Sequence, residues 1–502
     1  MKKLLVFTLL ISFLVTPNFA NAAVKAGSAC KKLNQVTNSN GKKYTCIKSG
    51  KKLIWNNGTT VQTAKFEFTD ICEKDPNVPS QWANYQQFAI RNFGCARPLR
   101  FVKTELSSVV PKTLVTNRNA LEDINVCKIS HGRRNNAGQI AFSTMYSPEI
   151  VLSKSLNIQI IPIEFTDFPS KNSPQIDNGK YFDYIRDGFF NLSDGNVNPV
   201  INVPTNYLKM NQTIESYSLP GRYSHGGGIW NWKNMDVNKL VNDITSVSDA
   251  SIDFSNVDLV FVVVPPNTDE DYIGHGWGST PRFRSSEKII NYIYFSPPMS
   301  EVSRKSWYGV EPFLHLHELM HAMNKLDDHY GDGDFGKIDG DAGTGNWGTM
   351  SGMTIDFLLW DKWITSMVTD EQIRCANPNQ TTTHWLRPST VFGKYEKGLV
   401  IPISSTKVVV VESMRASGFN YKLTKDMEGA LVYVVDTSKL DHGRGINVIR
   451  PKNRSGNIYA NPRFALSDAT LKLNESLEVA GVKVSVIERG SFGDVIKVER
   501  SN

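Results

Sequence analysis

The sequence has no long hydrophobic stretch after its N-terminus, few histidines and no strong excess of one charge. Beyond residue 22 no stretch of the 502-residue chain approaches 18 consecutive apolar residues, so we expect no transmembrane segment. The formal net charge is +7, and apart from a lysine-rich patch in residues 31–52 the basic residues are scattered. That excess is too mild to predict a nucleic-acid partner. With 40% hydrophobic residues the chain is too apolar to be disordered, and its length predicts two to four domains.

The N-terminus has the features of an export signal. Lys2 and Lys3 precede an apolar run in residues 4–15, and Ala20-Asn21-Ala22 provides small residues at a cleavage point. The run is too short to span a bilayer. We therefore predict a signal peptide over residues 1–22, cleavage after Ala22 and a secreted, extracellular protein.

None of the six cysteines forms a CxxC pair, so a zinc finger has no support. An even number of cysteines in an exported chain predicts disulfides. Pairing of near neighbours gives Cys30–Cys46 and Cys72–Cys95 and leaves Cys127–Cys375, although the sequence alone permits other connectivities.

Composition divides the chain into four parts after the signal. Residues 23–57 form a small module pinned by a disulfide, suited to cell-wall contact or simple spacing. Residues 58–150, with a helical pattern at 80–91, are either a pro-region or a cap. Residues 151–380 are expected to be the catalytic domain, and residues 381–502 a β-rich domain.

Residues 151–380 alternate between strand and helix patterns, which predicts an α/β (α+β) domain with a mixed sheet. The expected strands are residues 156–165, 257–265 and 289–295, and the expected helices are residues 237–247, capped by Asp236, and residues 311–325. Short apolar runs after residue 380 predict an all-β, sandwich-like C-terminal domain. Its expected strands are residues 399–403, 407–412, 430–436, 471–473 and 482–487.

His317, Glu318 and His321 form an HExxH motif inside the second predicted helix. Residues four apart lie on one face of a helix, so both imidazoles can bind one zinc ion. Glu318 lies beside the first histidine and can accept a proton from metal-bound water. Four of the nine histidines fall between residues 315 and 329, which strengthens the prediction.

The third zinc ligand is expected beyond the helix. Asn324 tolerates the left-handed conformation that ends a helix, so the chain can turn back and bring Asp327 to the metal. Asp327 is the preferred ligand, because zinc accepts carboxylate oxygens. His329, Asp328 and a distant glutamate remain alternatives.

The spacing from His317 to Asp327 resembles the metzincin signature HExxHxxGxxH/D, with Asn324 in place of the usual glycine. Residues 345–352 resemble the segment that carries the methionine turn beneath the zinc. Together these stretches resemble the immune inhibitor A family of secreted metallopeptidases, over roughly residues 150–500. Weaker matches lie at residues 163–169, 360–363, 412–415 and 429–433.

The resemblance implies a zincin or metzincin-like catalytic domain that hydrolyses peptide bonds in protein or peptide substrates. It implies that Met350, or alternatively Met353, lies beneath the metal. The family's tyrosine is shifted by one position, to Tyr330, whose hydroxyl is a candidate oxyanion or substrate contact.

A glycine-rich loop follows the motif and carries carboxylates at alternate positions, a pattern that suits calcium or a solvated acidic loop. Its acidic residues are Asp332, Asp334, Asp339 and Asp341. His131, His384 and His442 have no partner pattern, and the sequence assigns them no role.

Two other functions compete with a secreted zinc endopeptidase. One is a cell-surface or matrix-binding protein that uses this domain as a scaffold, and the other is a zinc hydrolase that acts on a non-peptide bond. The intact Glu318 argues against a scaffold, which has no use for a general base.

Overall fold

Contacts within the chain divide the computed structural model into two compact units, Met1–Glu67 and Phe68–Asn502. The predicted signal peptide, the Cys72–Cys95 pair and the predicted helix at 80–91 lie outside the described residues. The structure describes residues 25–31, 33, 36–39, 42–57, 59–60, 107–130, 138–142, 155–217, 236–269, 277–279, 282–296, 298, 313–331, 343–352, 355–420, 423, 425–452, 454 and 466–501.

The first unit contains a small antiparallel sheet. Its strands are β1 (Val36–Ser39), β2 (Lys42–Ser49), β3 (Lys52–Trp55) and β4 (Thr59–Thr60). Tyr44 and Cys46 alternate along β2 and pack against Trp55 in a core of three buried residues. The predicted Cys30–Cys46 disulfide is confirmed, and it stabilises a core too small to be stable by itself.

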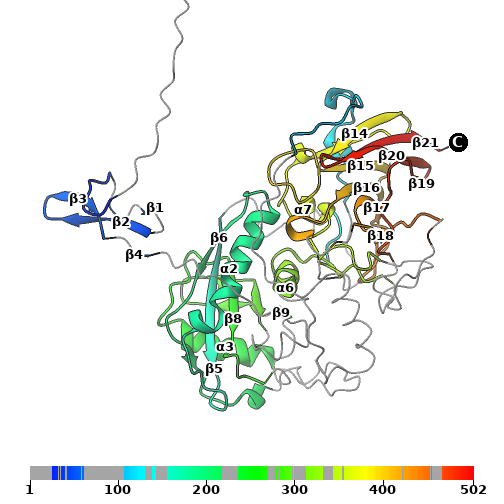
Figure 1. Ribbon diagram of the computed structural model, residues 1–502. Coiled ribbons are helices and arrows are strands. Elements are labelled where there is room, and N and C mark those ends of the chain that lie inside the picture. Colours follow the sequence, from blue (N-terminus) through cyan, green and yellow to red (C-terminus); the bar gives the residue numbers. More distant parts are fainter. Residues whose placement is uncertain are drawn as a thin grey trace, which may run out of the picture. The chain divides into compact units, whose positions relative to one another are not determined.

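The second unit begins with a mixed sheet in the order β6-β5-β8-β12-β9, and β7 also pairs with β5 (Figure 1). The strands are β5 (Ser155–Glu164), β6 (Asn198–Asn202), β7 (Leu208–Lys209), β8 (Leu259–Val263), β9 (Trp277–Ser279) and β12 (Ile293–Phe295). All these pairings are parallel except the antiparallel pairing of β9 with β12. The predicted mixed α/β character is therefore confirmed.

The predicted strand at residues 289–295 is two strands. β11 (Ile289–Ile290) pairs with β10 (Phe283–Arg284) in a separate hairpin, whereas β12 pairs with β8 in the large sheet. The pattern predicted the strand character correctly but not the change of partner, because local apolar periodicity carries no information about which strand lies alongside.

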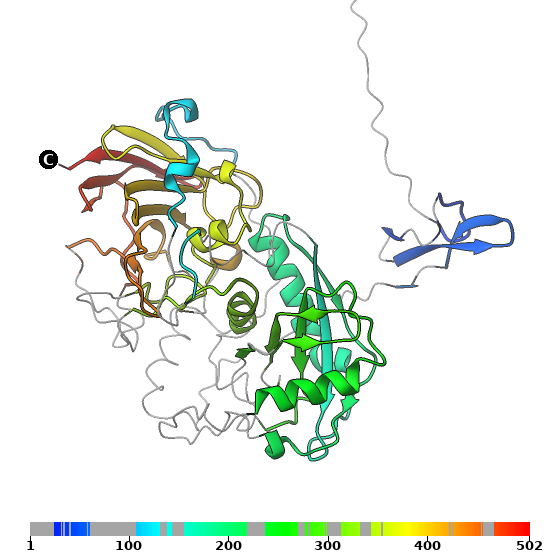
Figure 2. The same cartoon turned by 180° about the vertical axis from the view of Figure 1, so that it is seen from behind.

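Helices cover both faces of the large sheet (Figures 1 and 2). Ile158 and Ile160 of β5 face the core shared with α2 (Pro174–Leu192) and α6 (Phe313–Asn324). Ile161 and Ile163 face the core shared with α3 (Val237–Ser248). This split follows from the two-residue period of a strand, and it places α6 against one face.

Two of these helices differ in how well the sequence predicted them. The Asp236 carboxylate accepts a hydrogen bond from Lys239 N at 2.9 Å, as the predicted cap of α3 requires. Helix α2 was not predicted, because it contains Gly179 and Gly188, and glycine disfavours a helix interior. A Cβ at Gly188 would lie 3.3 Å from Leu316, so this glycine allows α2 and α6 to approach closely.

The remaining chain forms two β-sheets joined by a common core. One has the order β13-β15-β16-β17-β18 and the other β14-β21-β20-β19. The strands are β13 (Ile373–Cys375), β14 (Thr382–Leu386), β15 (Gly398–Ser404), β16 (Lys407–Met414), β17 (Gly429–Asp436), β18 (Ile446–Val448), β19 (Ser476–Val479), β20 (Val482–Gly490) and β21 (Gly493–Arg500). Val409 and Val411 of the first sheet share a buried cluster with Val484 and Ile496 of the second. The predicted strand at 471–473 is absent, and only an isolated bridge joins Leu471 to Ala430.

Short helices complete this unit. They are α7 (Leu359–Ile364), η1 (Arg118–Ala120), η2 (Ile124–Cys127), η3 (Ile214–Tyr217), η5 (Asp370–Gln372) and η6 (Gly418–Asn420). No helix among the described residues is long and apolar enough to cross a membrane.

Residues 107–130, part of the predicted pro-region or cap, are attached to the β-rich part. The predicted Cys127–Cys375 disulfide is confirmed, and Glu122 N donates to Cys375 O at 3.0 Å. Thr116 N likewise donates to Thr383 O at 2.9 Å. Cleavage of the backbone near residue 150 would therefore leave this segment covalently attached.

Candidate metal centre

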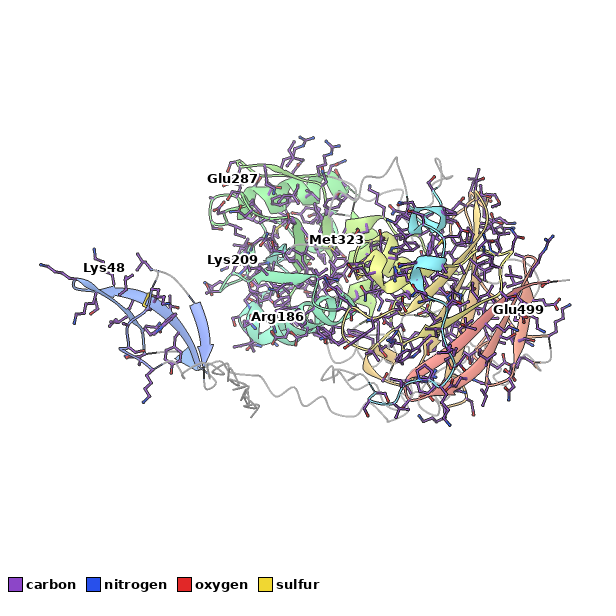
Figure 3. The ribbon with its side chains drawn as sticks, turned by 90° about the horizontal axis from the view of Figure 1, so that it is seen from above. Lys48, Arg186, Lys209, Glu287, Met323 and Glu499 are labelled. Atoms are coloured by element: carbon purple, nitrogen blue, oxygen red, sulfur yellow. A yellow bond between two sulfur atoms is a disulfide. The ribbon has the colours of Figure 1, made fainter. Side chains whose placement is uncertain are left out.

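Helix α6 carries His317 and His321 between the large sheet and the β-rich part. Met323, two residues after His321, lies between these two parts in Figure 3 and is 1% exposed. Leu316 and Met320 are fully buried and fix the rotation of the helix about its axis. The side chain of His317 is 2% exposed and that of His321 is 25% exposed. The two histidines therefore lie at the edge of the core, and only His321 reaches solvent.

Backbone carbonyls fix the orientation of both rings. Nδ1 of His317 lies 2.9 Å from Thr349 O, and Nδ1 of His321 lies 2.6 Å from Leu326 O. A carbonyl only accepts hydrogen bonds, so each Nδ1 carries the proton and each Nε2 presents a lone pair. The two Nε2 atoms are 3.0 Å apart. This is how metal-binding histidines are oriented by hydrogen bonds from the other ring nitrogen.

Asp328 completes the group. Its Oδ1 lies 3.2 Å from His317 Nε2 and 3.3 Å from His321 Nε2. Among the described residues these three are the group of side chains whose ligand atoms lie close enough together to hold a metal ion. Asp328 Oδ1 is also buried without a hydrogen-bond donor in the described part of the chain, and a bound cation would compensate for this.

The structure does not bring the preferred ligand, Asp327, to the histidines. Its carboxylate accepts hydrogen bonds from Gly138 N at 3.1 Å and Gly443 N at 3.0 Å. His442 Nδ1 lies 2.6 Å from the same carboxylate. Asp327 therefore joins three segments of the chain, and the adjacent Asp328, an alternative in the sequence analysis, faces the metal group.

The shift by one residue has a local cause. Asn324 was expected to take the left-handed conformation at the end of the helix, but Lys325 does so, with φ 52°. The turn thus comes one residue later, and the aspartate that reaches the histidines is one residue later too. Gln139 then forms an isolated parallel bridge with Leu326, which holds the loop in place.

The separations within the group suit zinc. Tetrahedral zinc with bonds of about 2.0–2.1 Å places its ligand atoms roughly 3.3 Å from one another. The observed separations between the three ligand atoms are 3.0, 3.2 and 3.3 Å. Three ligands on one face of a tetrahedron leave a fourth corner for water, as in catalytic zinc sites.

The charges within the group also favour binding of a positive ion. Burial opposes a charge on His321, but the Asp328 carboxylate outweighs it and raises the pKa of His321 to about 9. Burial alone would raise the pKa of Asp328, yet the charge of His321 and the neighbouring imidazoles hold that pKa well below its usual range. Burial raises the pKa of Glu318, and the two histidines oppose this effect. A metal ion can replace the proton that the group retains without it.

The other two histidines of the predicted cluster lie elsewhere. His329, an alternative third ligand, points Nε2 at Asp361 Oδ1 at 3.0 Å, and both side chains are buried. His315 contacts the Tyr294 hydroxyl at 2.8 Å inside the core, and burial lowers the pKa of His315 to about 3. These two histidines are therefore close to the metal-group histidines in sequence but do not belong to the metal group.

The segment expected to carry the methionine turn packs behind the metal group. Thr349 O receives the His317 hydrogen bond, and Met350 O accepts from His329 N at 3.0 Å. The Met350 side chain is fully buried in the core that contains α6. Its role beneath the metal stays a prediction.

Other predicted site residues are less defined. Tyr330 is partly buried against the same core, and its role as an oxyanion or substrate contact stays a prediction. Met353 and the four aspartates of the predicted calcium loop lie outside the described residues.

His442, whose place in the sequence predicts no role, reaches the metal group. Its Nε2 lies 3.3 Å from Asp328 Oδ2, and its side chain is 57% exposed. Hydrogen bonds to Asp327 and Asp328 raise the pKa of His442 to about 10. The distance of 115 residues from Asp327 explains why no local pattern revealed it.

No protein-family model matches this chain, and comparison with curated proteins finds no match. The resemblance to immune inhibitor A therefore rests on the motif residues themselves.

Proposed function

We propose that this protein is a secreted zinc-dependent endopeptidase with a metzincin-like catalytic domain. The observation that carries the proposal is the convergence of His317 Nε2, His321 Nε2 and Asp328 Oδ1 at separations of 3.0 to 3.3 Å. Zinc bound there supplies a Lewis acid that lowers the pKa of a bound water toward neutrality.

Glu318 is the residue proposed to move the proton. It lies next to His317 on α6, and its carboxylate is close enough to the metal group for the charges of His317, His321 and Asp328 to act on its pKa. We assign it the proton of the attacking water, which it then passes to the leaving amine. The hydrogen bonds at Nδ1 of His317 and His321 leave Nε2 of each ring as the nitrogen that would bind zinc.

A peptide substrate is favoured over other zinc hydrolase substrates by the strand next to α6. β9 contacts α6 and is the last strand of its sheet among the described residues (Figure 1). An extended peptide can add to such an edge through main-chain hydrogen bonds. A scaffold protein needs neither this edge nor Glu318.

The test measures metal content and proteolysis in the same preparation. The wild-type protein is expected to bind one zinc ion per chain, to cleave casein and to lose this activity with a chelator. Glu318→Gln is expected to keep zinc and to lose on the order of 10²- to 10⁴-fold in kcat. Undiminished cleavage by Glu318→Gln would remove this residue from the mechanism. A folded wild-type protein that binds no zinc would refute the proposal as a whole.

Secretion is proposed from the signal-like N-terminus and supported by two disulfides, which persist in oxidising compartments. Mass spectrometry of protein from culture medium is expected to find a mature chain that begins after Ala22. A protein that stays inside the cell and keeps residues 1–22 would contradict the proposed secretion.

Contact of the N-terminal module with an anionic cell-wall polymer is proposed from its charge. Residues 23–63 contain eight lysines and no acidic residue. Ten lysines lie in residues 1–63, which leaves 46 of the 56 basic residues for the rest of the chain, against all 49 acidic residues. The excess of basic over acidic residues is therefore confined to residues 1–63. Lys48, which Figure 3 labels, is exposed at one hairpin turn together with Lys51 and Lys52. Three exposed lysines suit salt-sensitive attraction to a polyanion.

Sedimentation of the full mature protein with polygalacturonate or polyphosphate beads tests this contact. Replacement of the three hairpin lysines by Gln is expected to abolish binding at low salt. A matched variant carries the same charge change on three exposed lysines of the second unit, Lys171, Lys209 and Lys439. Equal binding by both variants would refute the proposed contact.

A further inference from the structure

His442 reaches the metal group from a distant part of the chain. It lies between β17 and β18 of the β-rich part, whereas Asp327 and Asp328 follow α6. Nδ1 of its ring lies 2.6 Å from Asp327 Oδ1, and Nε2 lies 3.3 Å from Asp328 Oδ2. One imidazole therefore spans two adjacent carboxylates.

The two oxygens of Asp328 have different partners. Oδ1 faces both histidine Nε2 atoms, while Oδ2 faces His442. A carboxylate that binds a metal through one oxygen needs its other oxygen held if the ligand is to stay in one orientation. His442 is the side chain in that position.

The backbone next to His442 is fixed to the same loop. Gly443 N donates to Asp327 Oδ2 at 3.0 Å, and Gly443 O accepts from Gly331 N at 2.8 Å. Gly443 has φ +75°, a conformation that residues with a side chain rarely adopt. The loop that carries His442 is thus tied to the ligand loop on both sides of Asp328.

We propose that His442 is a positioning residue for the metal centre, which orients the Asp328 carboxylate and makes the β-rich part of the chain necessary for tight zinc binding. This inference rests on the proposed zinc site. It adds a fourth residue to that site and assigns the β-rich part a role in assembling it.

Zinc dissociation constants, measured by competition with a chromogenic chelator, test the inference in the full mature protein. His442→Ala is expected to weaken zinc binding by about 10- to 100-fold, the usual effect of losing a residue that supports a metal ligand. With cobalt in place of zinc, the visible absorption spectrum of this variant is expected to change, because the orientation of Asp328 changes. The side chain of His442 is 57% exposed, so its removal is expected to leave the metal-free protein folded.

Two conservative variants separate the two contacts of the ring. The amide nitrogen of Asn occupies roughly the place of Nδ1, and that of Gln roughly the place of Nε2. His442→Gln is therefore expected to restore zinc affinity, because it can donate to Asp328. His442→Asn is expected to restore only the contact with Asp327 and to bind zinc as weakly as His442→Ala.

Leu440→Ala is the matched control, because Leu440 lies in the same loop and is 42% exposed. It is expected to bind zinc like the wild type. Equal zinc affinity and equal cobalt spectra in wild type and folded His442→Ala would overturn the inference while leaving the proposed function intact. Absence of zinc binding by the wild type would refute both.

Discussion

Substitution of the two adjacent aspartates is expected to have opposite consequences for metal binding and for stability. Asp328→Ala removes one of three protein ligands. The binding free energy of zinc, about 10–16 kcal/mol for four ligands, gives about 3–4 kcal/mol for each, or a loss of roughly 10²- to 10³-fold in affinity. The apo protein is expected to lose less stability than with Asp327→Ala, because Asp328 Oδ1 accepts no hydrogen bond among the described residues and only the attraction between Asp328 and the charges of His321 and His442 is lost.

Asp327→Ala is expected to destabilise the fold. It leaves Gly138 N and Gly443 N without their acceptor, and each stranded buried donor costs about 1–3 kcal/mol. With the lost contact to His442, the total is about 3–5 kcal/mol. Asp327→Asn keeps one acceptor oxygen and is expected to lose about half as much.

The assay combines urea unfolding of the metal-free proteins with chelator competition for zinc. Asp327→Asn is expected to be less stable than wild type and to bind zinc with at most a modest loss, whereas Asp328→Asn is expected to lose less stability than Asp327→Asn and to bind zinc weakly. The reverse result, with zinc binding abolished at Asp327 and retained at Asp328, would show that the sequence-based choice of Asp327 was correct and would refute the reasoning from the loop geometry.

Three further predictions concern stability. Reduction of the Cys127–Cys375 disulfide, whose cysteines are 248 residues apart, is expected to cost about 5 kcal/mol through the entropy of the unfolded chain, and an unchanged melting temperature after reduction would contradict this. Burial raises the pKa of Glu412 from 4.5 to about 7, so its contribution to stability is full below pH 4.5 and is lost as the pH rises to 7. Glu412→Gln is therefore expected to be more stable than wild type at pH 8, by up to about 3 kcal/mol, and identical pH profiles of urea unfolding would exclude this cause. Lys397 and Asp194 form a buried ion pair. Lys397→Met is expected to lower the free energy of unfolding by about 3–5 kcal/mol, and the double variant with Asp194→Asn is expected to recover most of that loss. Equal stability of the single and double variants would contradict the pairing.

Some elements were predictable from the sequence because their information is local. The four-residue spacing of His317 and His321 requires only the period of a helix, and α6 has that period. The apolar strand at 257–265 and the Asp236 cap appear as β8 and α3 for the same reason. The Cys30–Cys46 pair was predictable because a separation of 16 residues limits its alternatives.

Sequence alone thus determined that two imidazoles and a carboxylate would lie on one helix, and it predicts zinc chemistry for them. Tertiary structure decided which aspartate faces the two histidines, because the choice between Asp327 and Asp328 depends on a backbone turn at Lys325 and on Gln139, from a segment nearly 190 residues earlier. It also decided the place of His442, 115 residues from Asp327. Contacts between distant segments leave no periodic pattern in either segment, because the conformation of each depends on residues far away in the chain.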